Sequence, residues 1–100
     1  MIPKQEDLHN EFKSSFSEEV IITLVSFANA KGGTVFLGIE DDGDICGVRL
    51  GKETVAKWIN EIKQKTDPSI IPDVEILEEN GRNIVLLSVQ EYPVKPVSVR

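Results

Sequence analysis

The sequence predicts a single α/β domain of the α+β type, with two helices packed on one face of a mixed β-sheet. Apolar residues recur at helical spacing in residues 17–30 and 52–65, and apolar, β-branched runs at 34–39 and 84–89 predict strands. The dipeptide Asn80-Gly81 lies between two apolar runs, which is a strong hairpin signal. Together these patterns predict the order β-α-β-β-α-β-β.

The N-terminal half of this order begins with a short strand over residues 10–16. Ser15 followed by Glu18 fits a capping box, so the first helix should begin directly after it. Gly32-Gly33 should end this helix, because glycine readily adopts the left-handed conformation that closes a helix.

The C-terminal half contains two predicted hairpins with a helix between them. Residues 41–44 (DDGD) should turn the preceding strand back onto a strand at 45–48. The second helix should end before Asp67-Pro68, because a proline disfavours helical geometry at the residue that precedes it. The last hairpin should join residues 74–77 to residues 84–89.

Length and composition indicate one domain, residues 1–100, in the cytoplasm. With 100 residues and 40% apolar side chains, the chain can bury a single core. No apolar run reaches the length of a membrane span, and the N-terminus lacks the apolar core of a signal peptide. Residues 92–100 stop without a turn or a cap, so we expect an N-terminal fragment of a longer protein whose C-terminal domain is absent.

Cysteine and histidine usage narrows the chemistry. Cys46 is the only cysteine and His9 the only histidine. This excludes a disulfide within the chain and a Cys/His zinc site. Any metal would be held by oxygen ligands, which suit Mg²⁺ or Mn²⁺.

The net charge of −6 argues against a protein that coats duplex DNA, because affinity for phosphates comes mainly from Lys and Arg. Nucleic-acid binding would therefore be local. Cations gather in residues 49–65, although a solvated helix face explains that segment as well as a phosphate-binding face does. The candidate phosphate contacts are Lys13, Lys31, Arg49, Lys52 and Lys57.

The tripeptide Glu11-Phe12-Lys13 is the first candidate site. On a strand, side chains at i and i+2 share a face, so Glu11 and Lys13 should point together while Phe12 enters the core. In metal-dependent nucleases, such a carboxylate binds the ion and such a lysine stabilises charge on the phosphate. The alternative is an exposed ion pair at a strand edge, which contributes little to stability.

Two further motifs carry less functional information. Residues 40–44 (EDDGD) have the composition of a turn and lack the distant glutamate of an EF-hand calcium loop. Residues 27–33 combine Gly-Gly with Lys31, yet the chain contains neither G-x-x-x-x-G-K-[ST] nor G-x-G-x-x-G. ATP binding by this chain alone therefore has no motif to support it.

In this order the motifs resemble the Schlafen AlbA-type domain, which occurs in prokaryotic DNA-binding and divergent AAA-type regulators. The resemblance covers nearly the whole chain, and the combination of motifs is more specific than any one of them. It implies an Alba-like fold and, because family members usually continue further, a longer protein. The matching segments are E-x4-E-F-K at 6–13, S-F-A-N-A-K-G-G at 26–33, F-L-G-I-E-D-D-G at 36–43 and I-C-G-V at 45–48.

The resemblance also implies a set of site residues. In some Schlafen proteins the equivalent domain is an RNA endonuclease whose three acidic residues bind a divalent metal. Carried over by motif, these acids are Glu6, Glu11 and Asp41, with Lys13 as an electrostatic helper. Those nucleases build a positive groove from two such lobes, so this chain would need a homodimer to form an equivalent groove.

Three functions remain open at this point. The first, which the resemblance favours, is a nucleic-acid-binding and specifically DNA-binding module of a prokaryotic transcriptional regulator. The second is a divalent-metal-dependent RNA or DNA endonuclease. The third is an interaction or dimerisation domain of an ATPase-like regulator, which the acidic pI of 4.7 favours.

Overall fold

The structure, a computed structural model, describes residues 2–100 and confirms the predicted fold class. The elements are β1 (Asn10–Lys13), α1 (Glu18–Ala28), β2 (Gly33–Leu37), α2 (Thr54–Gln64), β3 (Thr66–Asp67), β4 (Asp73–Glu79), β5 (Arg82–Val89) and β6 (Ser98–Val99). A mixed sheet of four strands has the order β1-β2-β5-β4, and β3 pairs with β6 in a second, small sheet. Strands β1 and β2 are parallel, whereas the other neighbours are antiparallel.

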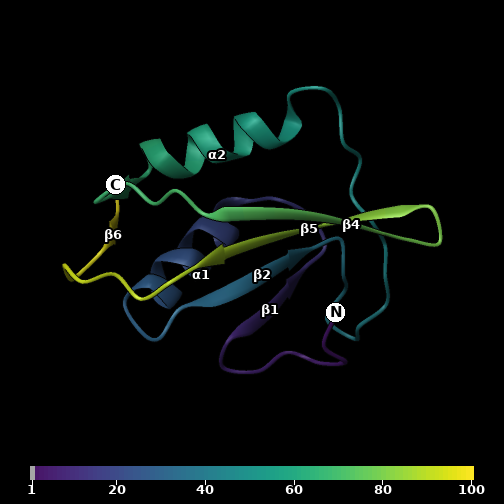
Figure 1. Ribbon diagram of the computed structural model, residues 1–100, viewed down its shortest axis with the longest axis horizontal. Coiled ribbons are helices and arrows are strands. Elements are labelled where there is room, and N and C mark those ends of the chain that lie inside the picture. Colours follow the sequence, from purple (N-terminus) through teal and green to yellow (C-terminus); the bar gives the residue numbers. More distant parts are fainter. Residues whose placement is uncertain (1) are drawn as a thin grey trace.

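The four-stranded sheet buries apolar side chains on both faces, because alternate residues of a strand point to opposite sides. On one face, side chains of β2 and β5 pack with residues of both helices, which confirms that the helices share a face. Figure 1 shows α1 behind the sheet and α2 along its β4 side. The other face carries a smaller cluster around Phe12 and Phe36, against which Ile2 and Ile45 pack. The N-terminal segment and the loop after β2 therefore lie on the same face.

Helix α1 begins after a serine and ends before a glycine, and the sequence predicted only the second of these boundaries correctly. Its N-cap is Ser17, which makes no side-chain cap hydrogen bond, so the predicted capping box of Ser15 and Glu18 is wrong. With Ser17 at the N-cap, Glu18 is the first helical residue, whereas a capping box needs the acid at the third. At the other end, the Gly32 N–H donates to the Phe27 carbonyl oxygen at 2.8 Å, and Gly32 has φ +86°. The predicted glycine stop is confirmed.

Residues 45–48 do not form the predicted strand. Two isolated bridges replace it, one from Ile45 back to Ile39 and one from Val48 to Asn83 of β5. The two bridges pair with different segments, and between them Gly47 has φ +75°, a value outside the range of a β-strand, so no continuous ladder forms. The second bridge pairs the loop after β2 with the beginning of β5.

Helix α2 is amphipathic and only partly embedded. Ile62 is fully buried, whereas Trp58 and Ile59 are half-buried against the core that the helices share. Phe16, which precedes α1, stacks on Trp58 with ring centroids 5.2 Å apart and planes 9° from parallel. Within residues 2–100, neither helix is long and apolar enough to cross a membrane.

The hairpin of β4 and β5 has the predicted turn. Asn80 and Gly81 have φ of 54° and 77°, and a two-residue type I′ turn needs positive φ at both positions. Strand β4 is an edge of the sheet. Its Val74 and Ile76 point to the helix face, opposite Leu87 and Val85, yet remain 40% and 50% exposed.

The C-terminal residues are tied to α1 through Asn29. Its side-chain amide donates to the Val97 carbonyl oxygen at 2.9 Å, and its amide oxygen accepts from the Val97 N–H at 2.7 Å. Immediately beyond, β6 pairs with β3. The end of the chain is therefore an integral part of this fold.

Candidate functional site

Glu6 and Glu11 meet at the free edge of β1. The backbone N–H of Phe12 donates to Glu6 Oε2 at 2.9 Å. In a parallel pair, alternate residues of a strand direct their backbone groups to the neighbour, and the Phe12 N–H points away from β2. Glu6 thus satisfies a backbone donor that would otherwise face solvent, and this contact brings its carboxylate next to Glu11.

The environment of Glu11 places the third predicted acid nearby. Burial, followed by a hydrogen bond with Glu6 and the Glu6 charge, raises the pKa of Glu11, and the Asp41 charge adds to this effect. The charge of Lys13 lowers the same pKa and only partly compensates. Glu6, Glu11 and Asp41 therefore occupy one neighbourhood, although they come from the N-terminal segment, β1 and the loop after β2.

Lys13 lies between two carboxylates. Its Nζ is 3.9 Å from Glu11 Oε2 and 3.5 Å from Glu19 Oε1, and its side chain is 24% exposed. Glu11 and Lys13 share a face, as their spacing on a strand predicts. Glu19 lies in the first turn of α1 and reaches Lys13 because a short loop joins β1 to this helix. Neutralisation by two acids leaves Lys13 a weak partner for a phosphate.

These acids do not form a ready metal centre. No group of three or more His, Cys, Asp or Glu side chains in residues 2–100 is arranged to hold a metal ion. Glu6 is engaged with the Phe12 N–H, and Asp41 is an exposed turn residue. As arranged, the three carboxylates do not fit Mg²⁺ or Mn²⁺, so we assign no metal-dependent step to them.

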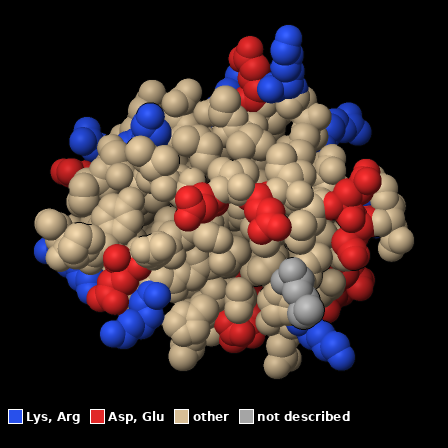
Figure 2. Space-filling model, viewed as in Figure 1, with Lys and Arg blue, Asp and Glu red and all other residues tan. Residues whose placement is uncertain are grey.

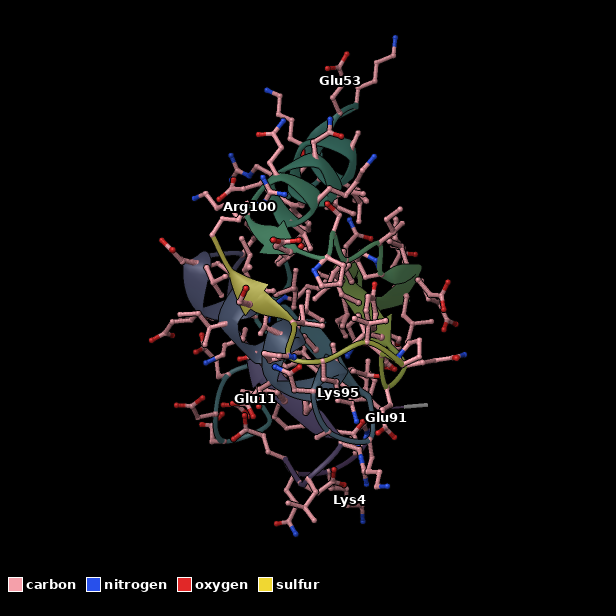
Figure 3. All side chains as sticks on the ribbon, turned by 90° about the vertical axis from the view of Figure 1, so that its left-hand side faces the viewer. Lys4, Glu11, Glu53, Glu91, Lys95 and Arg100 are labelled. Carbon is pink, nitrogen blue, oxygen red and sulfur yellow. The ribbon has the colours of Figure 1, made fainter. Side chains whose placement is uncertain are left out.

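Lys31, a predicted phosphate contact, is part of a separate charged cluster. Its Nζ lies 3.9 Å from Glu91 Oε1, and Glu91 also forms an ion pair with Lys95. Figure 3 shows Glu91 and Lys95 next to each other, away from Glu11. The hydrogen bond and the charge of Lys95, with a smaller effect of Lys31, lower the pKa of Glu91. Lys31 and Lys13 therefore do not form one continuous basic strip.

Arg49, Lys52 and Lys57 lack the ion pairs that engage Lys13 and Lys31 within the described residues. All three are exposed, and none takes part in an ion pair with a residue of the described chain. They follow one another along the loop before α2 and its first turn. Figure 2 shows Lys and Arg side chains around the rim of one face of the molecule, with Asp and Glu between them.

The sequence prediction missed Arg82. Its Nη1 donates to the Ile45 carbonyl oxygen at 2.7 Å, and it lines an open hollow of about 470 Å³ together with Arg49. The position of Arg82 directly after the Asn80-Gly81 turn was visible in the sequence. Its contact with the loop at Ile45 was not, because that contact depends on how the chain returns to β5.

Cys46 lies in the same loop. Burial first, and then the charge of Glu40 and a hydrogen bond with it, raise the pKa of the Cys46 thiol. The Sγ atom lies 3.8 Å from the Ser14 carbonyl oxygen. A thiol with a raised pKa is mostly protonated and is therefore a weak nucleophile.

Two solved structures share the fold. The DIP2311 protein from Corynebacterium diphtheriae matches with a TM-score of 0.70 and 20% identity, over 89% of this chain and 18% of that one. The N-terminal domain of a RecG-related protein from Nitrosomonas europaea, whose name connects it to ATP-dependent DNA helicases, matches with a TM-score of 0.71 and 21% identity. That match covers 92% of this chain and 69% of the other.

This chain spans less than a fifth of the DIP2311 protein, so it corresponds to one part of that larger molecule. No curated protein sequence matches it significantly. The family model described as "Schlafen, AlbA_2" matches residues 6–100, which is nearly the entire chain and includes the region of Glu6, Glu11 and Asp41. The chain therefore belongs to the Schlafen AlbA_2 family.

Proposed function

We propose that this chain is a nucleic-acid-binding module, most suited to DNA, of a prokaryotic transcriptional regulator that acts in the cytoplasm. The observation that carries the proposal is the exposed segment of Arg49, Lys52 and Lys57, whose cations are free of carboxylate partners within residues 2–100. Unpaired surface cations release counterions from a phosphate backbone when they bind it, and this release supplies most of the affinity.

Lys13 and Lys31 have a smaller role in this proposal. Each lies against at least one carboxylate, so a phosphate would have to compete with that acid. The net charge of −6 acts in the same direction, because the rest of the surface repels a polyanion. Binding should therefore be local, of modest affinity and strongly dependent on salt.

One of the similar structures indicates where such a domain lies within a longer protein. The RecG-related protein carries its similar domain at the N-terminus of a longer chain. We therefore infer that this domain is the N-terminal part of a longer regulator and holds nucleic acid for a C-terminal domain. Its own affinity need not be high, since linked sites raise the effective concentration of each other's ligands.

The test is a titration of labelled single-stranded and duplex DNA and RNA, followed by fluorescence anisotropy at about 50 and 200 mM salt. The triple variant Arg49→Gln, Lys52→Gln, Lys57→Gln should bind at least about tenfold more weakly at low salt. Its log–log salt slope should be smaller by roughly 2 to 3, because three phosphate contacts are lost.

A matched triple variant, Lys4→Gln, Lys95→Gln, Arg100→Gln, removes the same charge from exposed positions outside this segment. It should weaken binding much less. Equal losses for the two triple variants would mean that only net charge matters. Failure of the wild-type domain to bind at the lower salt concentration would contradict the proposed function itself.

A metal-dependent nuclease is the second candidate, and the shared neighbourhood of Glu6, Glu11 and Asp41 favours it. The acids as arranged do not make a three-ligand group, so a catalytic form would need them to move together, as binding of a second copy or of substrate could bring about. The same titration with Mn²⁺ tests this candidate. Metal-dependent cleavage that disappears in Glu11→Gln would establish it, and intact oligonucleotides would remove it.

An interaction domain of an ATPase-like regulator is the third candidate. Exposed apolar residues on and before the edge strand β4 favour it, namely Ile71, Val74 and Ile76. An edge strand with apolar side chains is a common place for another chain to pair. This candidate would gain if the domain binds no nucleic acid at either salt concentration but binds the remainder of its own longer chain.

A further inference from the structure

The loop 45–49 and the start of β5 enclose an open hollow of about 470 Å³. Its lining within the described chain includes two arginines and an asparagine but no Asp or Glu. The bridge between Val48 and Asn83 fixes the two walls, because the Val48 N–H donates to the Asn83 carbonyl oxygen at 2.9 Å. The lining residues are Cys46, Gly47, Val48, Arg49, Gly81, Arg82 and Asn83.

The guanidinium of Arg82 is held in place. Its Nη1 donates to the Ile45 carbonyl oxygen at 2.7 Å, which uses one of its five N–H donors and leaves the remainder for a ligand. Gly47 packs so closely that a Cβ there would lie 2.9 Å from the Arg82 Cβ. The backbone turn at Gly47 and the arginine are thus fitted to each other.

Arg49 supplies the second charge. It follows Val48 directly, so the bridge to β5 sets its position beside the hollow, and no ion pair among the described residues engages it. Gly81 opens the opposite side, since nothing lies within 4 Å of the place where its Cβ would be. A small anion can therefore reach both arginines.

Two acids lie close enough to weaken the site. Glu40 acts on the lining residue Cys46, whose thiol pKa is raised by burial and then by the Glu40 charge and a hydrogen bond with it. Glu79 is the cross-strand partner of Arg82 and lines a neighbouring, smaller hollow that also borders Arg82. No salt bridge links Glu79 to Arg82 within residues 2–100. Glu79 lines the neighbouring hollow and not this one, so its charge reduces the positive potential without filling the site.

We propose that the hollow between Arg49 and Arg82 binds one phosphate group of a nucleic-acid strand, with Asn83 as a neutral donor at its rim. Two guanidinium groups match the oxygens of a phosphate in charge and in hydrogen-bond geometry. The proposal rests on the proposed function, because it makes this phosphate the anchor of the strand that Lys52 and Lys57 contact further along.

The first experiment uses pyrophosphate and the ¹⁵N-labelled domain. Amide resonances of Gly47, Gly81 and Asn83 should shift together and saturate in wild type, whereas Arg49→Gln should bind pyrophosphate several-fold more weakly. Arg49 makes no side-chain hydrogen bond in the described chain, so this variant should keep the fold. Shifts that appear equally at Lys31 and Lys95, or no saturable shift at all, would overturn the site.

The second experiment uses the oligonucleotide that wild type binds best. Arg82→Lys keeps the charge and removes the planar fork, and it should weaken binding about five- to tenfold at constant salt. Arg100→Gln, which removes a charge from an exposed arginine outside the hollow, is the control and should change affinity less.

The outcomes separate the site from the function. Nucleic-acid binding that Arg82→Lys leaves intact would overturn the phosphate site and retain the proposed function. Saturable pyrophosphate binding in the hollow without nucleic-acid binding would contradict the proposed function and reassign the hollow to a free phosphate compound. The expected result is weaker pyrophosphate binding by Arg49→Gln and weaker oligonucleotide binding by Arg82→Lys, with a smaller change in the Arg100→Gln control.

Discussion

Glu11 should make the stability of the protein depend on pH, because burial and the neighbouring Glu6 raise its pKa. Between its ordinary pKa of 4.5 and its higher value in the fold, the folded protein binds more protons than the unfolded chain. Stability should therefore fall as the pH rises through that interval. The loss should be modest, because Glu11 is partly exposed and Lys13 opposes the effect.

Glu11→Gln should remove this pH dependence, and the variant should be at least as stable as wild type at pH 7. Thermal unfolding between pH 4 and pH 7 measures the difference. Glu19→Gln is the control, since it also removes a carboxylate beside Lys13 and leaves Glu11 next to Glu6. A wild-type pH profile that Glu11→Gln leaves unchanged would show that Glu11 titrates without affecting the fold.

Cys46 gives a second prediction for a single side chain. Because the nearby Glu40 carboxylate contributes to its raised pKa, Glu40→Gln should increase the thiolate fraction and speed alkylation by iodoacetamide at pH 8 about twofold to threefold. At a pH high enough to ionise the thiol in both proteins, the rates should converge. Equal rates at pH 8 would mean that burial alone controls this thiol.

The stack of Phe16 on Trp58 is a principal contact between the segment before α1 and helix α2. Since Ile62 is the single fully buried residue of α2, this helix depends on such lateral contacts. A double-mutant cycle with Phe16→Leu and Trp58→Leu should give a coupling of about 0.5 to 1.5 kcal/mol in the free energy of unfolding. Chemical denaturation measures it, and strictly additive losses would contradict a direct ring interaction.

Local signals predicted the elements that depend on few residues. Asn80-Gly81 and Gly32 are examples, because the turn and the helix stop are each dictated by the backbone freedom of the residue itself. Residues 45–48 were predicted as a strand from their composition. Their actual path is set by Gly47 and by pairing with Asn83, a partner far away in the sequence. The capping box at Ser15 failed for a local reason, because the helix begins two residues later than predicted, with Ser17 at its N-cap.

The contact of Asn29 with Val97 joins two parts of the fold that are far apart in the sequence. Two hydrogen bonds from one half-buried side chain join the end of α1 to the C-terminal residues. Asn29→Ala should lower the free energy of unfolding by about 1 to 3 kcal/mol, because Val97 would lose both partners for its backbone groups. Ser26→Ala, on the exposed surface of α1, should have little effect.

Hydrogen exchange distinguishes the two ways in which that stability could be lost. If Asn29 holds the C-terminal residues in place, the Val97 amide should exchange much faster in Asn29→Ala while the amides of β5 keep most of their protection. Equal acceleration of exchange in β5 would mean that the Asn29 contact stabilises the whole fold instead of holding the C-terminal residues locally.

The candidate site could be predicted from the sequence only in part, because the sequence does not show which acids pair with its cations. The spacing of Glu11 and Lys13 on one strand was enough to place them together. The neutralisation of Lys13 by Glu19 depends on the geometry of the short loop between β1 and α1, and that of Lys31 by Glu91 depends on how the C-terminal segment packs. Arg82 was missed for the same reason.

The free edge of β4 has a consequence for how copies of this molecule meet. Its apolar side chains Val74 and Ile76 alternate with acidic ones, and Glu78 and Glu79 follow. Two such edges brought side by side would place carboxylates against carboxylates, and like charges in cross-strand positions disfavour pairing. The edge is thus protected against fibre-like stacking of identical chains while it stays open to a strand rich in lysine or arginine. The acidic edge should therefore disfavour self-aggregation and favour pairing with a basic strand of another protein.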